Sequence, residues 1–176
     1  MPRHADRARP NPSAPWVIDT RELGRRPGAM RSYHRTVPLP AGLGLDVVGI
    51  PQGDEVALDV RLESVMEGVL VSGTASARLT GECARCLDPL MDRLEVDLTE
   101  LFAYPDTATD ETTDPGEVSR VVDDLVDLEP VVRDAVLLAL PQAPVCRDDC
   151  PGLCPECGGK RAELGTDHWH DTMDPR

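Results

Sequence analysis

The sequence predicts an α+β fold: an antiparallel β-meander or partly closed sheet, one main packed helix, and a C-terminal zinc-knuckle segment. Three observations support this prediction. Apolar and polar residues alternate through most of residues 32–102, as in strands with one buried face. One apolar helical segment follows, and six cysteines occur in two groups, at 83–86 and 146–157.

The strands are expected in short alternating segments that turn residues separate. Their ranges are 32–39, 45–50, 55–63, 69–71, 74–80 and 90–102. Gly73 is expected to divide the fourth strand from the fifth, because glycine weakens a strand interior. This arrangement places Cys83 and Cys86 at the tip between two antiparallel strands.

One helix is expected between Asp127 and Pro141. Asp127 is placed to cap its start, and Glu129 and Pro130 suit a first turn. Pro141 ends the helix because proline has no amide hydrogen to donate. Valine, alanine and leucine cover a broad face, so the helix is expected to pack on the sheet and lead to the last cysteines.

A single α+β domain is expected over residues 16–160, between two tails. Residues 1–15 are rich in proline and arginine and are expected to form a disordered basic arm. Residues 105–120 are polar and acidic, and a mobile acidic loop is expected there. The cysteine cluster takes residues 146–158, and residues 161–176 are expected to be a flexible tail.

The net charge of −14 is unevenly distributed. Residues 1–36 hold eight arginines and three acidic residues, a net +5, so the rest of the chain carries −19. An acidic body favours basic partners, whereas an arginine-rich segment can touch RNA; simple solubility is the plainer interpretation of the acidic body. The arginines expected to bind RNA or a partner are Arg21, Arg25, Arg26, Arg31 and Arg35.

No membrane or export signal is evident. The longest apolar run, 135–140, is far shorter than the roughly 20 residues of a membrane span. A cytoplasmic protein is therefore expected, and in a reducing compartment clustered cysteines favour metal binding over disulfides.

The cysteines predict a structural zinc site. Zinc takes four ligands in a tetrahedron, and the favoured set is Cys83 and Cys86 with Cys154 and Cys157, as two turns facing each other across the ion. Other assignments remain open. Cys146 and Cys150 are alternates or neighbours, and a site within the tail alone leaves little backbone between its second and third cysteines. His168 and His170 are expected to be ordinary surface residues.

Catalytic motifs are not found in the sequence. It contains no phosphate-binding glycine loop, no Gly-x-Ser-x-Gly and no His-Glu-x-x-His, so no enzyme is expected. A thiol-redox pair at Cys83 and Cys86 is a rival interpretation. Such pairs normally begin a helix, where the dipole lowers the thiol pKa, and here the flanking residues predict strands.

Several segments together resemble the bacterial YceD family, the large ribosomal RNA subunit accumulation proteins. They are Cys83-Ala-Arg-Cys86-Leu-Asp-Pro, the Asp127-Leu-Glu-Pro to Leu138-Ala-Leu-Pro141 block, the Cys146 to Gly158 run with its Gly-Leu-Cys-Pro-Glu-Cys-Gly element, and Leu23 to Met30. The resemblance implies a non-enzymatic factor in ribosome biogenesis. The uneven charge suggests the partners: the acidic body is expected to hold a basic ribosomal protein, and the arginines at 21–35 are expected to touch the large-subunit ribosomal RNA precursor. No membrane and no small-molecule substrate are expected. A zinc-stapled adaptor unrelated to ribosomes is the alternative.

Overall fold

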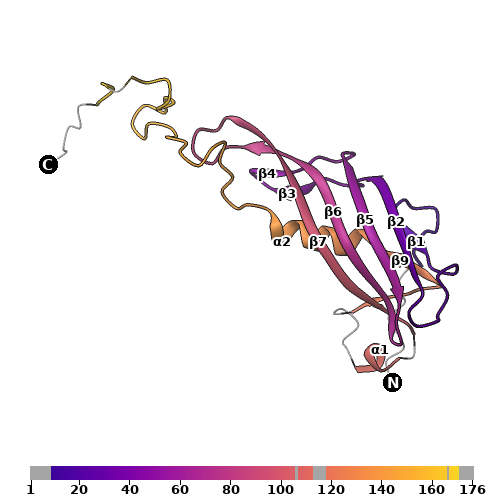
Figure 1. Cartoon of the computed structure of the whole chain (residues 1–176). Helices are drawn as coiled ribbons and strands as arrows, with labels where there is room; N and C mark the ends of the chain where they lie inside the picture. Colours follow the sequence, from indigo (N-terminus) through magenta and orange to yellow (C-terminus); the bar gives the residue numbers. More distant parts are fainter. Residues whose placement is uncertain (1–8, 106, 113–117, 166, 171–176) are drawn as a thin grey trace.

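The computed structural model describes residues 9–105, 107–112, 118–165 and 167–170, and its main body is a seven-stranded sheet with one long helix packed against it (Figure 1). The α+β class with one main helix is confirmed, and partial closure of the sheet stays a prediction. The elements are β1 (Val17–Asp19), β2 (Met30–Pro38), β3 (Leu43–Leu45), β4 (Val48–Ile50), β5 (Glu55–Ser64), β6 (Gly68–Glu82), β7 (Pro89–Ala103), α1 (Ala108–Thr112), β8 (Ser119–Arg120), β9 (Leu125–Asp127) and α2 (Glu129–Ala139).

Strand β6 is the centre of the sheet. It pairs antiparallel with β7 along its whole length on one side. On its other side it pairs with β5 and, nearer its end, with β4. β2 and β3 lie outside β5 and β4, β8 runs parallel to the end of β7, and β1 and β9 form a separate two-stranded sheet. The β6–β7 hairpin therefore reaches the end of the sheet, with Cys83 and Cys86 in its tip as predicted.

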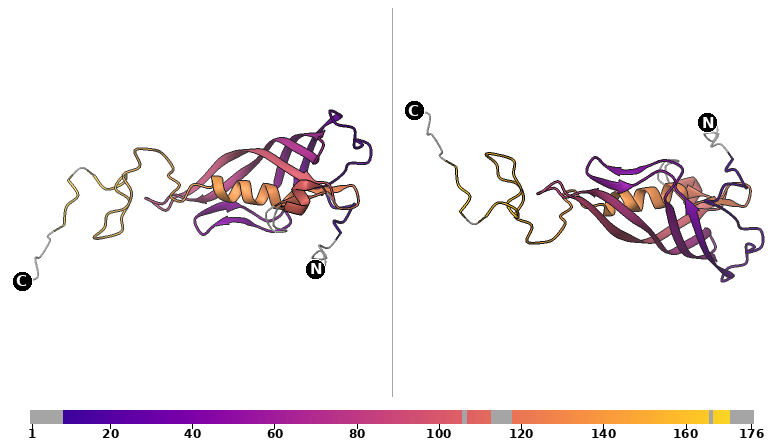
Figure 2. Two further views of the ribbon diagram at one scale, coloured as in Figure 1. Left: turned by 90° about the horizontal axis from the view of Figure 1, so that it is seen from below. Right: turned by 90° about the horizontal axis from the view of Figure 1, so that it is seen from above.

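The core lies between one face of the sheet and α2. The helix contacts β7 and β3, and Figure 2 shows it along one face of the sheet with the β3–β4 hairpin on its other side. The strands alternate as expected of a half-buried sheet. Buried side chains on the helix-facing side of the sheet include Val56, Leu58, Val60, Leu62, Val71, Leu79, Val96 and Leu98, and the helix contributes Val132 and Val136. We call the other side the open face, because no described helix covers it.

The prediction that Gly73 divides two strands was wrong, because β6 is continuous through it. Gly73 pairs with Val60 and Leu98 and has a φ of 150°. A Cβ atom there would lie 2.1 Å from the carbonyl oxygen of Asp59, so glycine permits the close approach of β5. The strand expected at 45–50 is instead two strands, β3 and β4, which form a hairpin around Asp46 and Val47.

The predicted helix is present as α2, with a different start. Leu128 is the N-cap residue and makes no side-chain cap, whereas Asp127 lies one residue earlier. An Asp127 carboxylate oxygen still accepts the amide hydrogen of Glu129 at 3.1 Å. The helix ends at Ala139, two residues before Pro141.

The expected domain boundaries remain predictions. Of the basic arm, residues 1–8 lie outside the described chain, while Arg9 forms a 3.0 Å ion pair with Asp123. Of the loop at 105–120, residue 106 and residues 113–117 lie outside it; the described part includes α1 and β8. Of the tail at 161–176, residues 166 and 171–176 are likewise outside. Among the described residues, no helix is both long and apolar enough to span a bilayer.

Candidate metal centre

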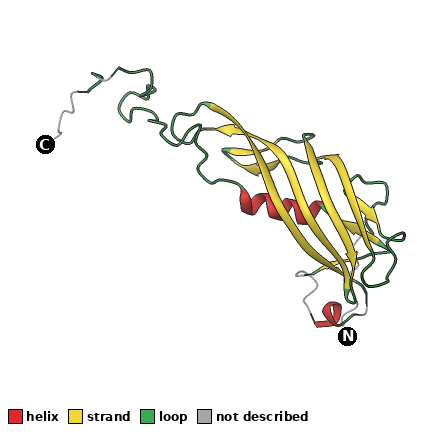
Figure 3. Ribbon diagram, viewed as in Figure 1, coloured by secondary structure: helices red, strands yellow, loops and turns green. Residues whose placement is uncertain are grey.

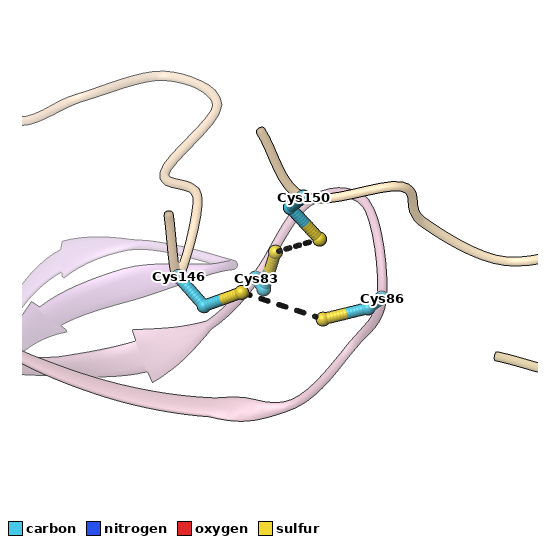
Figure 4. A group of neighbouring side chains, drawn as sticks. All are labelled: Cys83, Cys86, Cys146 and Cys150. Atoms are coloured by element: carbon cyan, nitrogen blue, oxygen red, sulfur yellow. Dashed lines mark hydrogen bonds between the residues drawn. The ribbon is translucent and has the colours of Figure 1, made fainter. Parts of the chain in front are cut away.

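The tip of the β6–β7 hairpin is a tight turn that brings two thiols to one side. The amide of Cys83 donates to the carbonyl of Asp88 at 2.8 Å, and the amide of Leu87 donates to the carbonyl of Cys83 at 2.9 Å. Leu87 takes a φ of 60°, which is unusual for a residue with a side chain. This turn points Cys83 and Cys86 toward the same space (Figure 4).

The chain that follows α2 is bound to this tip by backbone hydrogen bonds. The amide of Ala84 donates to the carbonyl of Pro144 at 2.7 Å, and the amide of Leu153 donates to the carbonyl of Arg85 at 3.0 Å. The Arg85 guanidinium donates to the carbonyl of Cys150 at 3.1 Å. Figure 3 shows that loops and turns, with no helix or strand, make up the described chain beyond α2, so these contacts position it.

Four sulfurs meet at the tip, and we call Cys83, Cys86, Cys146 and Cys150 the hairpin cluster. Their Sγ atoms all lie within 4.8 Å of one another, with 3.8 Å between Cys83 and Cys150 and 3.7 Å between Cys86 and Cys146 (Figure 4). A tetrahedron of sulfurs 2.3 Å from zinc has edges of about 3.8 Å. All four are free thiols, and the cluster can hold a metal ion.

The hairpin cluster is mostly inside the protein. Cys83, Cys86 and Cys150 are buried, Val145 packs against them, and Cys146 is exposed. Because three of the four donors are buried, water can approach the cluster only from the side of Cys146. Protein would enclose a bound ion on its remaining sides.

The thiols of the hairpin cluster differ in acidity because their surroundings differ. Burial raises the pKa of Cys83, but backbone amides of Cys146, Cys86 and Arg85 outweigh it and lower that pKa to about 6. The Asp88 amide lowers the pKa of Cys86, yet burial and the neighbouring thiols raise it to about 12. The neighbouring Cys150 thiol and burial also raise the pKa of Cys146, so a bound cation would favour the thiolate forms of Cys86 and Cys146.

A second group of donors lies further along the chain, and we call Cys154, Cys157, His168 and His170 the tail cluster. Its four ligand atoms also lie within 4.8 Å of one another. The Sγ of Cys154 is 3.3 Å from Nε2 of His170, and the Sγ of Cys157 is 3.6 Å from Nε2 of His168. This group can hold a metal ion as well.

The two cysteines of the tail cluster belong to a small hairpin. The amide of Gly158 donates to the carbonyl of Cys154 at 2.8 Å, and the amide of Cys154 donates to the carbonyl of Gly159 at 2.7 Å. Gly158 has a φ of 70°, which favours glycine. The amides of Cys157 and Glu156, followed by the side chain of His168, lower the pKa of Cys154 to about 6.

The structure does not bring the favoured set of Cys83, Cys86, Cys154 and Cys157 together. Cys146 and Cys150, in the chain that follows α2, lie at the hairpin tip with Cys83 and Cys86. Cys154 and Cys157 lie with two histidines. His168 and His170, which were expected to be ordinary surface residues, belong to a group that can hold a metal ion. Their spacing from Cys157 follows no familiar metal-binding pattern. The one signal in the sequence was that two histidines follow shortly after two cysteines that had no other partners.

Lys160 and Asp88 connect the two clusters. Their side chains form an ion pair, which lowers the pKa of Asp88 and raises that of Lys160. The Asp88 carboxylate also accepts a hydrogen bond from the Cys86 thiol at 3.4 Å. The backbone of Lys160 forms an isolated antiparallel β-bridge with Leu153, the residue before Cys154 of the tail cluster. One partly exposed ion pair thus joins the hairpin tip to the start of the tail.

The five arginines predicted to bind RNA or a partner are all exposed, from the turn after β1 into β2: Arg21, Arg25, Arg26, Arg31 and Arg35. Arg31 pairs with Glu22 at 2.6 Å, and Arg25 pairs with Asp124 at 3.4 Å. Arg26 forms no ion pair with any residue in the described part of the chain. Local carboxylates therefore offset part of this positive charge, and RNA binding stays a prediction.

Comparison with known proteins identifies related sequences. The family model described as large ribosomal RNA subunit accumulation protein YceD matches residues 71–176, a range that includes both clusters. Uncharacterized protein Mb2951c of Mycobacterium bovis and uncharacterized protein Rv2926c of Mycobacterium tuberculosis are each 55% identical over 175 residues, which is 99% of this chain and 84% of the relative. Uncharacterized protein ML1660 of Mycobacterium leprae is 48% identical over 92% of this chain and 74% of its own length. No solved structure matches significantly.

Proposed function

Because the chain belongs to the YceD family of large ribosomal RNA subunit accumulation proteins, we propose that it is a non-enzymatic ribosome-biogenesis factor of the cytoplasm. Its role is to support accumulation of large-subunit ribosomal RNA by binding a basic ribosomal protein, the RNA precursor, or both. The observation that carries this proposal is the family match over residues 71–176.

The hairpin cluster serves this function as a structural zinc site. Four thiolates are soft donors that suit Zn²⁺, and the sulfur separations of 3.7 and 3.8 Å fit its tetrahedron. When bound, zinc supplies a rigid link between the hairpin tip and the chain after α2. Cys83 and Cys86 lie between two strands and not at a helix start, which argues against a thiol-redox role.

The acidic body supports a cationic protein as partner. The open face presents five acidic side chains from β5 and β7: Glu55, Asp59, Glu63, Glu95 and Asp97. It presents three arginines: Arg61, Arg78 and Arg93. One of these, Arg78, is paired with Asp54 at 3.0 Å. The excess of negative charge attracts basic protein segments and repels phosphate, so the RNA contact is assigned to the arginines at 21–35.

Co-sedimentation with large-subunit precursors tests the proposal directly. We expect the protein to sediment with these precursors in cell extracts and to retain a basic ribosomal protein when it is isolated. The Glu95→Gln/Asp97→Asn variant should lose that protein, while Arg61→Gln on the same face should retain it. A protein that remains at the top of the gradient and recovers no ribosomal protein would contradict the proposal and favour an unrelated adaptor.

RNA contact has a separate readout. Arg26 and Arg35 form no ion pair with any described residue, but the Arg35 guanidinium donates to the carbonyl of Val17 at 3.4 Å, so Arg26 is the more available of the two for a phosphate. The Arg26→Ala variant should weaken RNA binding and reduce the salt-dependence slope by about one. Arg93→Ala, on the open face, is the matched control. Equal RNA binding by both variants and the unaltered protein would assign the function to protein contacts alone.

A further inference from the structure

We propose that the tail cluster is a second zinc site, with Cys154, Cys157, His168 and His170 as its four ligands. This site is separate from the hairpin cluster and does not depend on the ribosomal role. It would make the protein a carrier of two structural zinc ions with different donor sets, four thiolates in one and two thiolates with two imidazoles in the other.

The number of donors is the first argument. Six cysteines are two short of two tetrathiolate sites, and the hairpin cluster takes four of them. Cys154 and Cys157 then need two further ligands. His168 and His170 supply them, since their Nε2 atoms lie 3.6 and 3.3 Å from the two sulfurs. A tetrahedral zinc site with these donors has sulfur–nitrogen edges of about 3.6 Å.

The orientation of the histidines is the second argument. Their rings stand edge to face with centroids 4.5 Å apart, and both turn Nε2 toward the thiols. Trp169, between them, is 75% exposed. The two polar rings therefore face the cysteines while the large apolar one faces solvent, which is the reverse of what hydrophobic burial alone would favour.

The nitrogen–nitrogen distance shows what metal binding must change. The two Nε2 atoms are 2.8 Å apart, the separation of a hydrogen bond, whereas a zinc tetrahedron requires about 3.3 Å. Zinc would replace that hydrogen bond, with each ring moving by a few tenths of an ångström. Both imidazoles would then be neutral, with their remaining protons on Nδ1.

The protein context makes the tail site local. All four ligands come from residues 154–170. The backbone hydrogen bonds between Cys154 and the glycines at 158 and 159 already shape the cysteine half of the site. The amide of His168 donates to the carbonyl of Gly165 at 3.0 Å, which turns the chain back toward the cysteines. Zinc at this site would therefore order the tail and hold Trp169 outward without involving the sheet.

Metal content of the purified full-length chain tests the site. We expect two zinc ions per chain, and one in the His168→Gln/His170→Gln variant after dialysis against a chelator. These histidines lie outside the core, so the double variant should keep a melting temperature within about 3 °C of the unaltered protein. The matched control is His34→Gln, which removes an exposed histidine paired with Asp59 at 3.0 Å and should leave two zinc ions.

Cobalt substitution identifies the donors. The unaltered protein minus the double histidine variant should give the spectrum of a tetrahedral site with two thiolates and two imidazoles, which has weaker charge-transfer bands than a four-thiolate site. One zinc ion in the unaltered protein would overturn the proposal. Two ions retained in the double histidine variant, or a difference spectrum of four thiolates, would overturn it as well.

Discussion

The hairpin cluster and the tail cluster differ in how they draw on the chain. Cys86 and Cys146, which meet in the hairpin cluster, are 60 residues apart, whereas the tail cluster lies within residues 154–170. Three of the four hairpin donors are buried, while Cys157 of the tail cluster is exposed. A metal ion in the first would hold distant parts of the fold together, and one in the second would shape only its own segment.

Two metal sites with the same number of ligands therefore need not contribute equally to the stability of the fold. A cross-link that closes a long loop removes more conformational freedom from the unfolded chain than one that closes a short loop. The hairpin cluster should therefore dominate the stability of the domain. The tail cluster should determine the order of the tail and little else.

The largest effect is expected from the double variant Cys83→Ser/Cys150→Ser. It removes two buried ligands, so the hairpin cluster should lose its zinc and the melting temperature should fall by more than about 10 °C. The matched variant Cys154→Ser/Cys157→Ser should lower it by less than about 3 °C. Thermal unfolding followed by circular dichroism, together with metal analysis, measures both, and equal shifts would show that the two clusters contribute equally to stability.

A core substitution should separate folding energy from metal binding. Leu62 is fully buried in β5, so Leu62→Ala should reduce the free energy of unfolding by about 3 kcal/mol, or the melting temperature by roughly 8 °C. Zinc content at 25 °C should stay unchanged, because Leu62 pairs with Val71 near the start of β6, whereas the clusters lie at the other end of the β6–β7 hairpin. Loss of zinc from the folded variant would show that cluster and core are coupled.

An intermediate effect is expected from Arg85→Gln. The Arg85 guanidinium donates to the carbonyls of Asp148 at 3.0 Å and Cys150 at 3.1 Å, and so holds the second half of the hairpin cluster. Its loss should weaken zinc binding by about tenfold and lower the melting temperature by about 4 °C. Competition with a chromophoric chelator measures the affinity. Arg93→Gln, which loses a hydrogen bond to Ser76, is the control and should leave zinc affinity unaltered.

The smallest effect is expected from Lys160→Met, which breaks the ion pair between the two clusters. The pair is partly exposed, so the melting temperature should fall by only about 2 °C and both zinc ions should remain. Because the pKa of Asp88 is lowered in the folded protein, the ion pair stabilises the fold above the ordinary carboxyl pKa of about 3.9, and this stabilisation is lost as pH falls below it. Because the pKa of Lys160 is raised, the stabilisation is present below about pH 10 and is lost above it. The difference between variant and parent should thus be constant from about pH 6 to 9, and a difference that varies within that range would exclude this pair as its cause.

The sequence was sufficient for the elements with clear periodicity. The alternation in β5 and β7 and the apolar surface of α2 each follow from burial of one face, so both strands and the helix were predicted. The turn at Asp46 was missed because no glycine or proline marks it. Gly73 was misjudged because the close approach of Asp59, which explains it, is a contact between strands and not a local property.

The sequence indicated the cysteines as candidate metal donors but not which of them lie together. Their spacing predicts metal binding, whereas which pair meets which depends on the path of the chain after Pro141. That path is set by contacts such as the hydrogen bond from Ala84 to Pro144, which no local pattern reveals. His168 and His170 were set aside because a polar terminus gives no periodic signal for a site.

The long separation of Cys86 and Cys146 has a consequence for the order of events during synthesis. β7, α1, β8, β9 and α2 all lie between these two cysteines, so the four sulfurs can meet only after those elements have been synthesised. Metal capture by all four thiols would then come late in synthesis. A newly made molecule carrying that ion would be one whose last helix has already been made.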